Sequence, residues 1–101
     1  MRGKIVVDGY HFKNENEYRR YKGILELVKD GRLQDLDVNP KYPLMVNQVE
    51  VDSYSPTFRF YDPVKHAERF IQVSNAAQST IQELRIRLFE AIYAVKVERW
   101  G

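Results

Sequence analysis

The sequence predicts an α/β fold, a small mixed β-sheet flanked by two main helices, with a β-hairpin near the N-terminus. Two stretches carry apolar residues at the spacing of an amphipathic helix, one in the first third of the chain and one in the last third. The segments around them alternate apolar and polar residues, as strands with one buried face do. A chain of 101 residues suffices for one domain, so we expect a single domain over residues 1–101.

The segment KIVVDGYHF contains two short apolar runs around Asp8-Gly9. This dipeptide suits a type I′ turn, because both central residues of that turn need a positive φ. We therefore predict a hairpin over residues 4–12.

The first helix is predicted over residues 14–30. Asn14 is a suitable N-cap, and Glu17 three positions later completes the capping-box pattern. Gly31 is a suitable helix stop, since glycine adopts the left-handed conformation without strain.

The middle of the chain, about residues 33–74, is predicted to form two or three strands. Pro40 and Pro43 predict an interrupted or edge strand, because proline donates no ladder hydrogen bond. The stretch RFIQVSN alternates so that Gln72 and Ser74 share one strand face.

The second helix is predicted over residues 78–93, with Ser79 or Asn75 as its cap, and a final strand over 94–99. Its apolar stripe is expected to comprise Ile81, Leu84, Leu88 and Ile92, supported by Phe89. A strand, a helix and a further strand in this order predict a parallel crossover onto the same sheet.

Composition excludes several functional classes. With 44% apolar and 30% charged residues and no cysteine, the chain is an ordinary globular sequence without disulfides, thiolate metal sites or cysteine nucleophiles. No apolar run approaches the roughly 18 residues of a membrane span, and the first residues lack a signal-peptide pattern. We therefore expect a cytoplasmic location.

Charge is unevenly distributed, although the net charge is only +2. Residues 33–62 hold five acidic and two basic side chains, so the basic excess lies in the flanking segments. This pattern is compatible with a rim that binds phosphate groups, and equally with a mixed, solvated surface.

The segments VDGYHFKNENEYRRY, LQDLDVNPKYPL and RLFEAIYAVKVERW, in this order, resemble a family of phage-encoded proteins. These proteins have the restriction-endonuclease-like fold of the PD-(D/E)xK nucleases and are similar to Holliday-junction resolvases. The resemblance covers almost the whole chain, and it implies a viral protein whose partner is DNA.

In this family an aspartate on one strand and an acid on the next hold Mg²⁺, and a lysine two residues beyond the second acid assists the chemistry. On this sequence the aspartate position is Thr57, the second acid is Gln72 and the lysine is Ser74. Only Glu17, at the acidic position of the first helix, keeps its charge. The resemblance therefore implies a degenerate active site with no catalytic residues, no bound metal and no other cofactor.

Two functions remain open. The first is a non-cleaving protein that binds nucleic acid weakly, with Arg19, Arg20, Arg85 and Arg87 as the phosphate contacts. The second is a protein-interaction module that engages a host or phage protein or forms a homodimer. An active Mg²⁺-dependent, structure-specific endonuclease is the least favoured alternative; it would need a displaced metal centre, for which the nearby carboxylates would be Asp52, Asp62 and Glu68.

Overall fold

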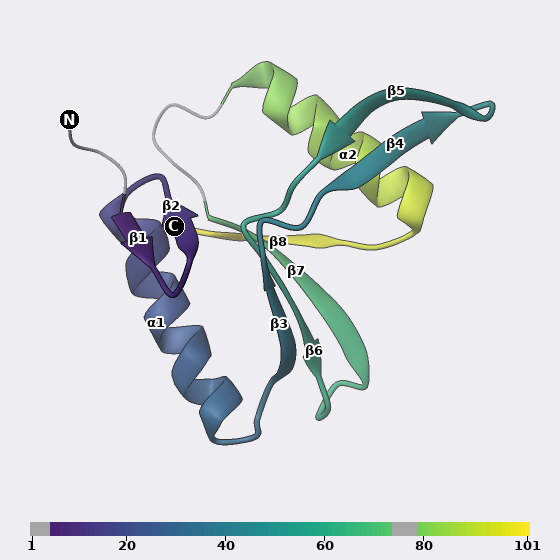
Figure 1. The fold of residues 1–101 in the computed structure, drawn as a ribbon. Helices are drawn as coiled ribbons and strands as arrows, with labels where there is room; N and C mark the ends of the chain where they lie inside the picture. The colour runs from purple at the N-terminus through teal and green to yellow at the C-terminus, as the bar shows by residue number, and fades with distance from the viewer. Residues whose placement is uncertain (1–4, 74–78) are drawn as a thin grey trace.

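The computed structural model describes residues 5–73 and 79–101, and it is an α/β structure with two helices and several small sheets (Figure 1). The elements follow in the order β1 (Ile5–Val7), β2 (Tyr10–Phe12), α1 (Glu15–Lys29), β3 (Gln34–Val38), β4 (Tyr42–Val46), β5 (Val49–Tyr54), β6 (Phe58–Asp62), β7 (Ala67–Val73), α2 (Thr80–Tyr93) and β8 (Val97–Trp100).

The N-terminal elements form as their local sequence predicts. Asp8 and Gly9 both have positive φ, 55° and 81°, and connect the antiparallel strands β1 and β2. At the start of α1, the Asn14 side chain accepts a hydrogen bond of 2.9 Å from the Glu17 backbone N–H. Gly31 follows the helix with a φ of 78°.

The central sheet has four strands in the order β3-β6-β7-β8. The strands β3, β6 and β7 are antiparallel neighbours, whereas β8 lies parallel to β7 after the chain has passed through α2. The predicted parallel crossover is therefore confirmed. No helix of residues 5–73 and 79–101 is long and apolar enough to cross a lipid bilayer.

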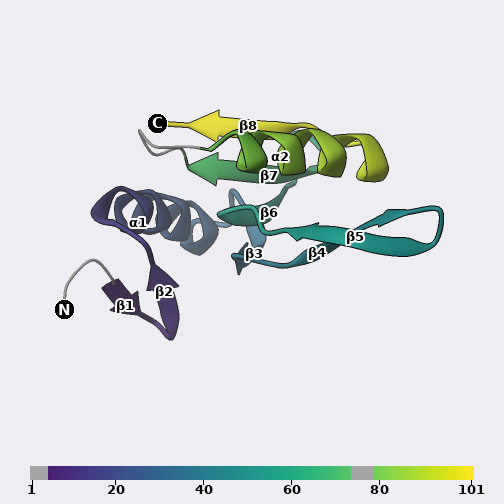
Figure 2. The ribbon, with the colours of Figure 1, turned by 90° about the horizontal axis from the view of Figure 1, so that it is seen from above.

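The two faces of this sheet pack against different helices. Ile71 and Val73 of β7 belong to a buried cluster with Tyr21 and Ile24 of α1. Phe70, which points the other way because side chains alternate along a strand, belongs to a second cluster centred on α2. The helices α1 and α2 thus lie on opposite sides of the sheet, and Figure 2 shows α2 running alongside β7 and β8.

The prediction of two or three strands over residues 33–74 was wrong, because this segment forms five. The hairpin of β4 and β5 is a separate two-stranded sheet that extends away from the central sheet beside α2 (Figure 1). Pro40 and Pro56 lie in the breaks before and after it, where proline ends ladder pairing. Its turn residues Asn47 and Gln48 both have positive φ. An Asn-Gln dipeptide does not predict this turn, because the usual signal has glycine at the second position.

The buried face of α2 also differs from the predicted stripe. Ile86 and Phe89 are fully buried, whereas Ile81 is 60% exposed and Leu84 is 58% exposed. Leu88 is only partly buried at the edge of the same core. The face that packs is the one met by both the central sheet and the β4–β5 hairpin, a tertiary arrangement that helical periodicity alone does not specify.

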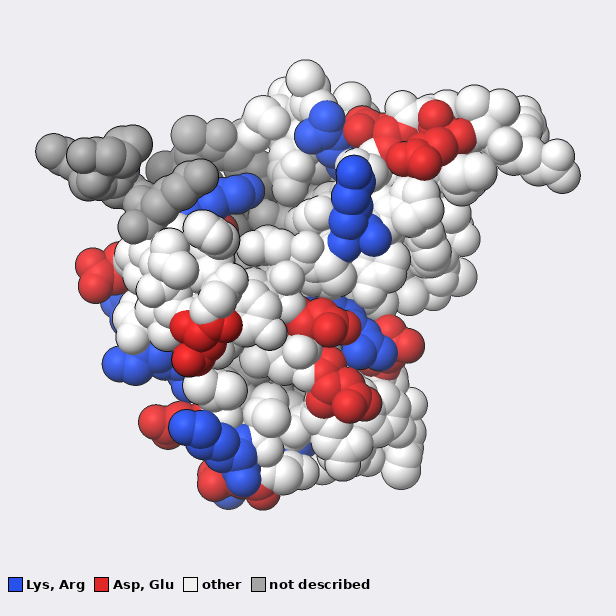
Figure 3. All heavy atoms as spheres, in the orientation of Figure 1, with Lys and Arg blue, Asp and Glu red and all other residues white. Residues whose placement is uncertain are grey.

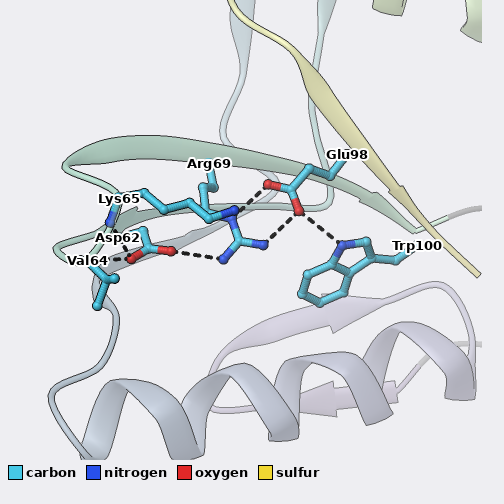
Figure 4. Close-up of polar contacts among 6 residues, drawn as sticks. All are labelled: Asp62, Val64, Lys65, Arg69, Glu98 and Trp100. Carbon is cyan, nitrogen blue, oxygen red and sulfur yellow. Dashed lines mark hydrogen bonds and ion pairs between the residues drawn. The ribbon is translucent and has the colours of Figure 1, made fainter.

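An ionic network lies at the end of the central sheet where β6 turns into β7. The Arg69 guanidinium lies between Asp62 and Glu98, with contacts of 3.1 and 2.7 Å (Figure 4). The other oxygen of Asp62 accepts the backbone N–H groups of Val64 and Lys65, which shapes the β6–β7 turn. The network thereby joins this turn to β8.

Candidate functional site

Thr57 and Gln72, the two described residues at the predicted site positions, lie side by side, although Thr57 directly precedes β6 and is not part of it. The β6–β7 register pairs Phe58 with Ile71, so Thr57, one residue earlier, lies across from Gln72. The Thr57 hydroxyl accepts a hydrogen bond of 3.0 Å from the backbone N–H of Val73, which adjoins Gln72 in the chain. The third position, Ser74, lies outside the described residues.

The polar atoms at these positions are engaged in bonds within the protein. Both side chains are buried, with Thr57 3% and Gln72 8% exposed. The Gln72 Oε1 atom accepts hydrogen bonds from the Tyr54 hydroxyl at 2.5 Å and from Gln82 Nε2 at 3.3 Å. Since an amide oxygen has two lone pairs, both acceptor sites of Gln72 are occupied, and a metal ion would have to displace one of these donors.

Glu17 has a capping role at the start of α1. Its side chain is 3% exposed, and its Oε1 atom accepts the Lys13 backbone N–H at 3.1 Å. Its carboxylate forms no hydrogen bond with Thr57 or Gln72 in the described part of the chain. The structure therefore gives this acid a local structural partner.

A polar surface pocket of about 250 Å³ adjoins Gln72. Its lining residues come from the start of α1, the end of β5 and the first turns of α2: Lys13, Asp52, Ser53, Tyr54, Ser55, Gln82 and Arg85. Tyr54 and Gln82, which line the pocket, are the two side chains that donate hydrogen bonds to Gln72, so the pocket adjoins Gln72. We call it the Lys13–Arg85 pocket.

Two cationic side chains and one carboxylate line this pocket. The Arg85 Nε atom donates to Asp52 Oδ2 at 2.8 Å, and this bond lowers the pKa of the Asp52 carboxyl. The second oxygen of Asp52 accepts the Ser53 backbone N–H, so each carboxylate oxygen has a partner within the protein. The Arg85 terminal nitrogens and the Lys13 ammonium have no partner among residues 5–73 and 79–101, which leaves the pocket with a net positive charge.

The carboxylates named for a displaced metal centre do not meet. Asp52 belongs to the β4–β5 hairpin, whereas Thr57 lies between that hairpin and β6. Asp62 lies five residues beyond Thr57 along β6, about 17 Å at the usual strand rise, and Glu68 pairs with Tyr61 near the same end. Within the part of the chain that the structure describes, no three acidic or histidine side chains gather closely enough to hold a metal ion.

The four predicted phosphate-binding arginines occupy separate places. Arg85 lines the Lys13–Arg85 pocket, and Arg87 is exposed on α2. Arg19 and Arg20 line another hollow on α1, where Arg20 donates two hydrogen bonds to the Gly101 carbonyl. On the face seen in Figure 3, basic side chains are interspersed with acidic ones.

Sequence reasoning missed Lys13 as a member of the site. The available signal was its position directly before the N-cap of α1, a point where the chain enters from the hairpin. Comparison of the chain with protein-family models, with characterised proteins and with solved structures finds no match.

Proposed function

We propose that this chain is a phage-type protein with a restriction-endonuclease-like fold that binds nucleic acid weakly and does not cleave it. The observation that carries the proposal is the placement of Thr57 and Gln72. Thr57 directly precedes β6 and lies beside Gln72 of the neighbouring strand β7, as a metal-binding acid pair would, yet both are held by internal hydrogen bonds. In this proposal, Thr57 and Gln72 support the fold instead of binding a metal ion.

The topology supports this reading. A metal site built from two neighbouring strands needs ligand side chains that lie close together on one face of the sheet. The β6–β7 pair brings Thr57 and Gln72 together in this way. The Lys13–Arg85 pocket then offers two cations and two serine hydroxyls where a phosphate group would lie.

The binding test uses labelled duplex and four-way DNA with and without Mg²⁺. We expect affinity to fall steeply with salt, because bound phosphates release counterions, and we expect no cleavage products. The double variant Lys13→Gln, Arg85→Gln removes two phosphate contacts, so the slope of log K against log salt becomes shallower by about 2. The matched control Lys29→Gln, Lys96→Gln removes the same charge from exposed sites outside the pocket and leaves that slope nearly unchanged.

Two results would contradict the proposal. Mg²⁺-dependent cleavage by homogeneous protein that is abolished by Asp52→Ala would point to an active, displaced metal site. Equal loss of binding in the pocket variant and the control would mean that charge alone attracts the DNA.

A second candidate function is a protein-interaction module, as a homodimer or with a host or phage protein. Exposed apolar side chains favour it: Ile81 and Leu84 on α2, and Val46, Val49 and Val51 on the β4–β5 hairpin. Association through these surfaces would be insensitive to salt, in contrast to nucleic-acid binding. Analytical ultracentrifugation at low and high salt separates the two candidates.

A further inference from the structure

A second hollow, of about 490 Å³, adjoins the first residue of β4 and shares no lining residue with the Lys13–Arg85 pocket. It is lined by Tyr42, Ala67, Glu68, Phe70, Tyr93 and Val95, which come from β4, β7 and the end of α2. Three of the six are aromatic, and Glu68 is the only charged one. We call it the Tyr42–Tyr93 pocket.

The aromatic rings form walls that meet at steep angles. The Tyr42 ring lies 5.6 Å from the Tyr93 ring at 67° and 5.9 Å from the Phe70 ring at 77°, measured between centroids. The Tyr93 hydroxyl donates to the Pro43 carbonyl at 2.8 Å, which holds its ring in place, and the residue remains 38% exposed. All three rings also contact Phe89, so they form one aromatic cluster at the hollow, in which Tyr93 is the ring that solvent reaches most.

The electrostatic surroundings favour a cation. The Glu68 side chain is 50% exposed, and its Oε1 atom accepts Arg59 Nε at 2.9 Å. Arg59 does not line the pocket, is 18% exposed and also pairs with Asp37, so this group of three carries a net negative charge. The C-terminal end of α2 adds its partial negative charge, because Tyr93 is the last helical residue and the last turn contains no basic side chain.

We propose that the Tyr42–Tyr93 pocket binds an arginine side chain presented by a basic segment of a partner protein. A planar guanidinium stacks on a tyrosine face and donates to a carboxylate with the same group, which a compact ammonium does not do. The second oxygen of Glu68 has no hydrogen-bond partner among the described residues and is the acceptor. This site is independent of the nucleic-acid proposal, since it shares no residue with the Lys13–Arg85 pocket.

The test is an NMR titration of the full chain with the blocked peptide acetyl-Gly-Arg-Gly-amide. We expect the amide signals of Ala67 and Val95 to shift with a dissociation constant of about 1 to 10 mM, typical of one anchored side chain. The same peptide with citrulline, which keeps the shape and removes the charge, binds at least about fivefold more weakly.

Two variants locate the site. Glu68→Gln weakens binding of the arginine peptide about two- to fivefold. Tyr93→Leu weakens binding by the same factor, because it replaces the aromatic ring with an aliphatic side chain. The matched control is Glu50→Gln, which removes an exposed carboxylate from the β4–β5 hairpin and leaves binding unchanged. The dispersion of the NMR signals verifies that each variant is folded. If Tyr93→Leu is unfolded, Glu68→Gln alone locates the site.

Several outcomes would overturn the proposal. Equal affinity for the arginine and citrulline peptides would show that no cation is recognised. If Glu50→Gln lowers the affinity for the arginine peptide as much as Glu68→Gln does, the peptide is attracted by general charge. If no amide signal shifts at about 10 mM peptide, no site exists. Displacement of the peptide by a short DNA duplex would assign the pocket to nucleic acid instead.

Discussion

The hydrogen bond between Tyr54 and Gln72 provides a direct test of the proposal that Gln72 has a structural role. Both residues are buried, and the hydroxyl lies 2.5 Å from Gln72 Oε1. Tyr54→Phe leaves that oxygen with only the longer bond from Gln82, so we expect a loss of about 1 kcal/mol in the free energy of unfolding. Gln72→Met leaves the Tyr54 hydroxyl buried without a partner, which costs about 1–3 kcal/mol.

The double variant Tyr54→Phe, Gln72→Met distinguishes a specific bond from general damage to the core. It removes both polar partners at once, so neither is left unpaired and the change approaches neutrality. We therefore expect the single effects to be non-additive, with a coupling energy of about 2–4 kcal/mol.

Urea unfolding, followed by far-UV circular dichroism and Trp100 fluorescence, measures these changes. For slopes of about 1–2 kcal/mol per molar urea, the single variants lower the midpoint by about 0.5–3 M. Tyr93→Phe is the control, because the Tyr93 hydroxyl donates to the Pro43 carbonyl at an exposed site where water can take the place of the hydroxyl. We expect this variant to lower the free energy of unfolding by less than about 0.5 kcal/mol. Additive single effects, or a Gln72→Met loss no larger than the control, would refute the structural interpretation.

Three further predictions concern pH and metal binding. The Arg69 hydrogen bond lowers the pKa of Glu98 in the folded protein. Glu98 therefore stabilises the fold at a pH above its pKa in the unfolded chain, and this stability is lost as the pH falls through its lower pKa in the folded protein. Glu98→Gln should flatten the acid limb of a plot of urea midpoint against pH. Burial, and then the bond to Asp8, raises the pKa of Tyr21 to about 12, so stability should fall as the pH rises from 10 toward 12, and Tyr21→Phe should lessen that fall in thermal melts. The triple change Thr57→Asp, Gln72→Glu, Ser74→Lys should create a Mg²⁺ site detectable by calorimetry and absent from the parent chain, whereas heats equal to the parent's would contradict the alignment with the family.

Local structure was largely predictable because its signals act over a few residues. The Asp8-Gly9 turn, the Asn14 cap with Glu17 and the Ser79 cap are each formed by atoms within four positions in the chain. Strand alternation placed Gln72 and Ile71 on opposite faces for the same reason.

The candidate site was predictable only in part. The positions of Thr57 and Gln72 came from a resemblance in order and spacing, and the strand register places them together. Lys13 and Arg85 are 72 positions apart, and no local pattern indicates that the chain brings them to one pocket.

The sequence by itself therefore determined the α/β composition and the helix ends, because these depend on residue type and short-range geometry. The tertiary structure alone decided that residues 42–54 form a separate hairpin, and that Ile86 and Phe89 rather than Ile81 and Leu84 face the core. The physical reason is that two helical faces of α2 have similar apolar content, and burial goes to the face that the hairpin and the sheet enclose together.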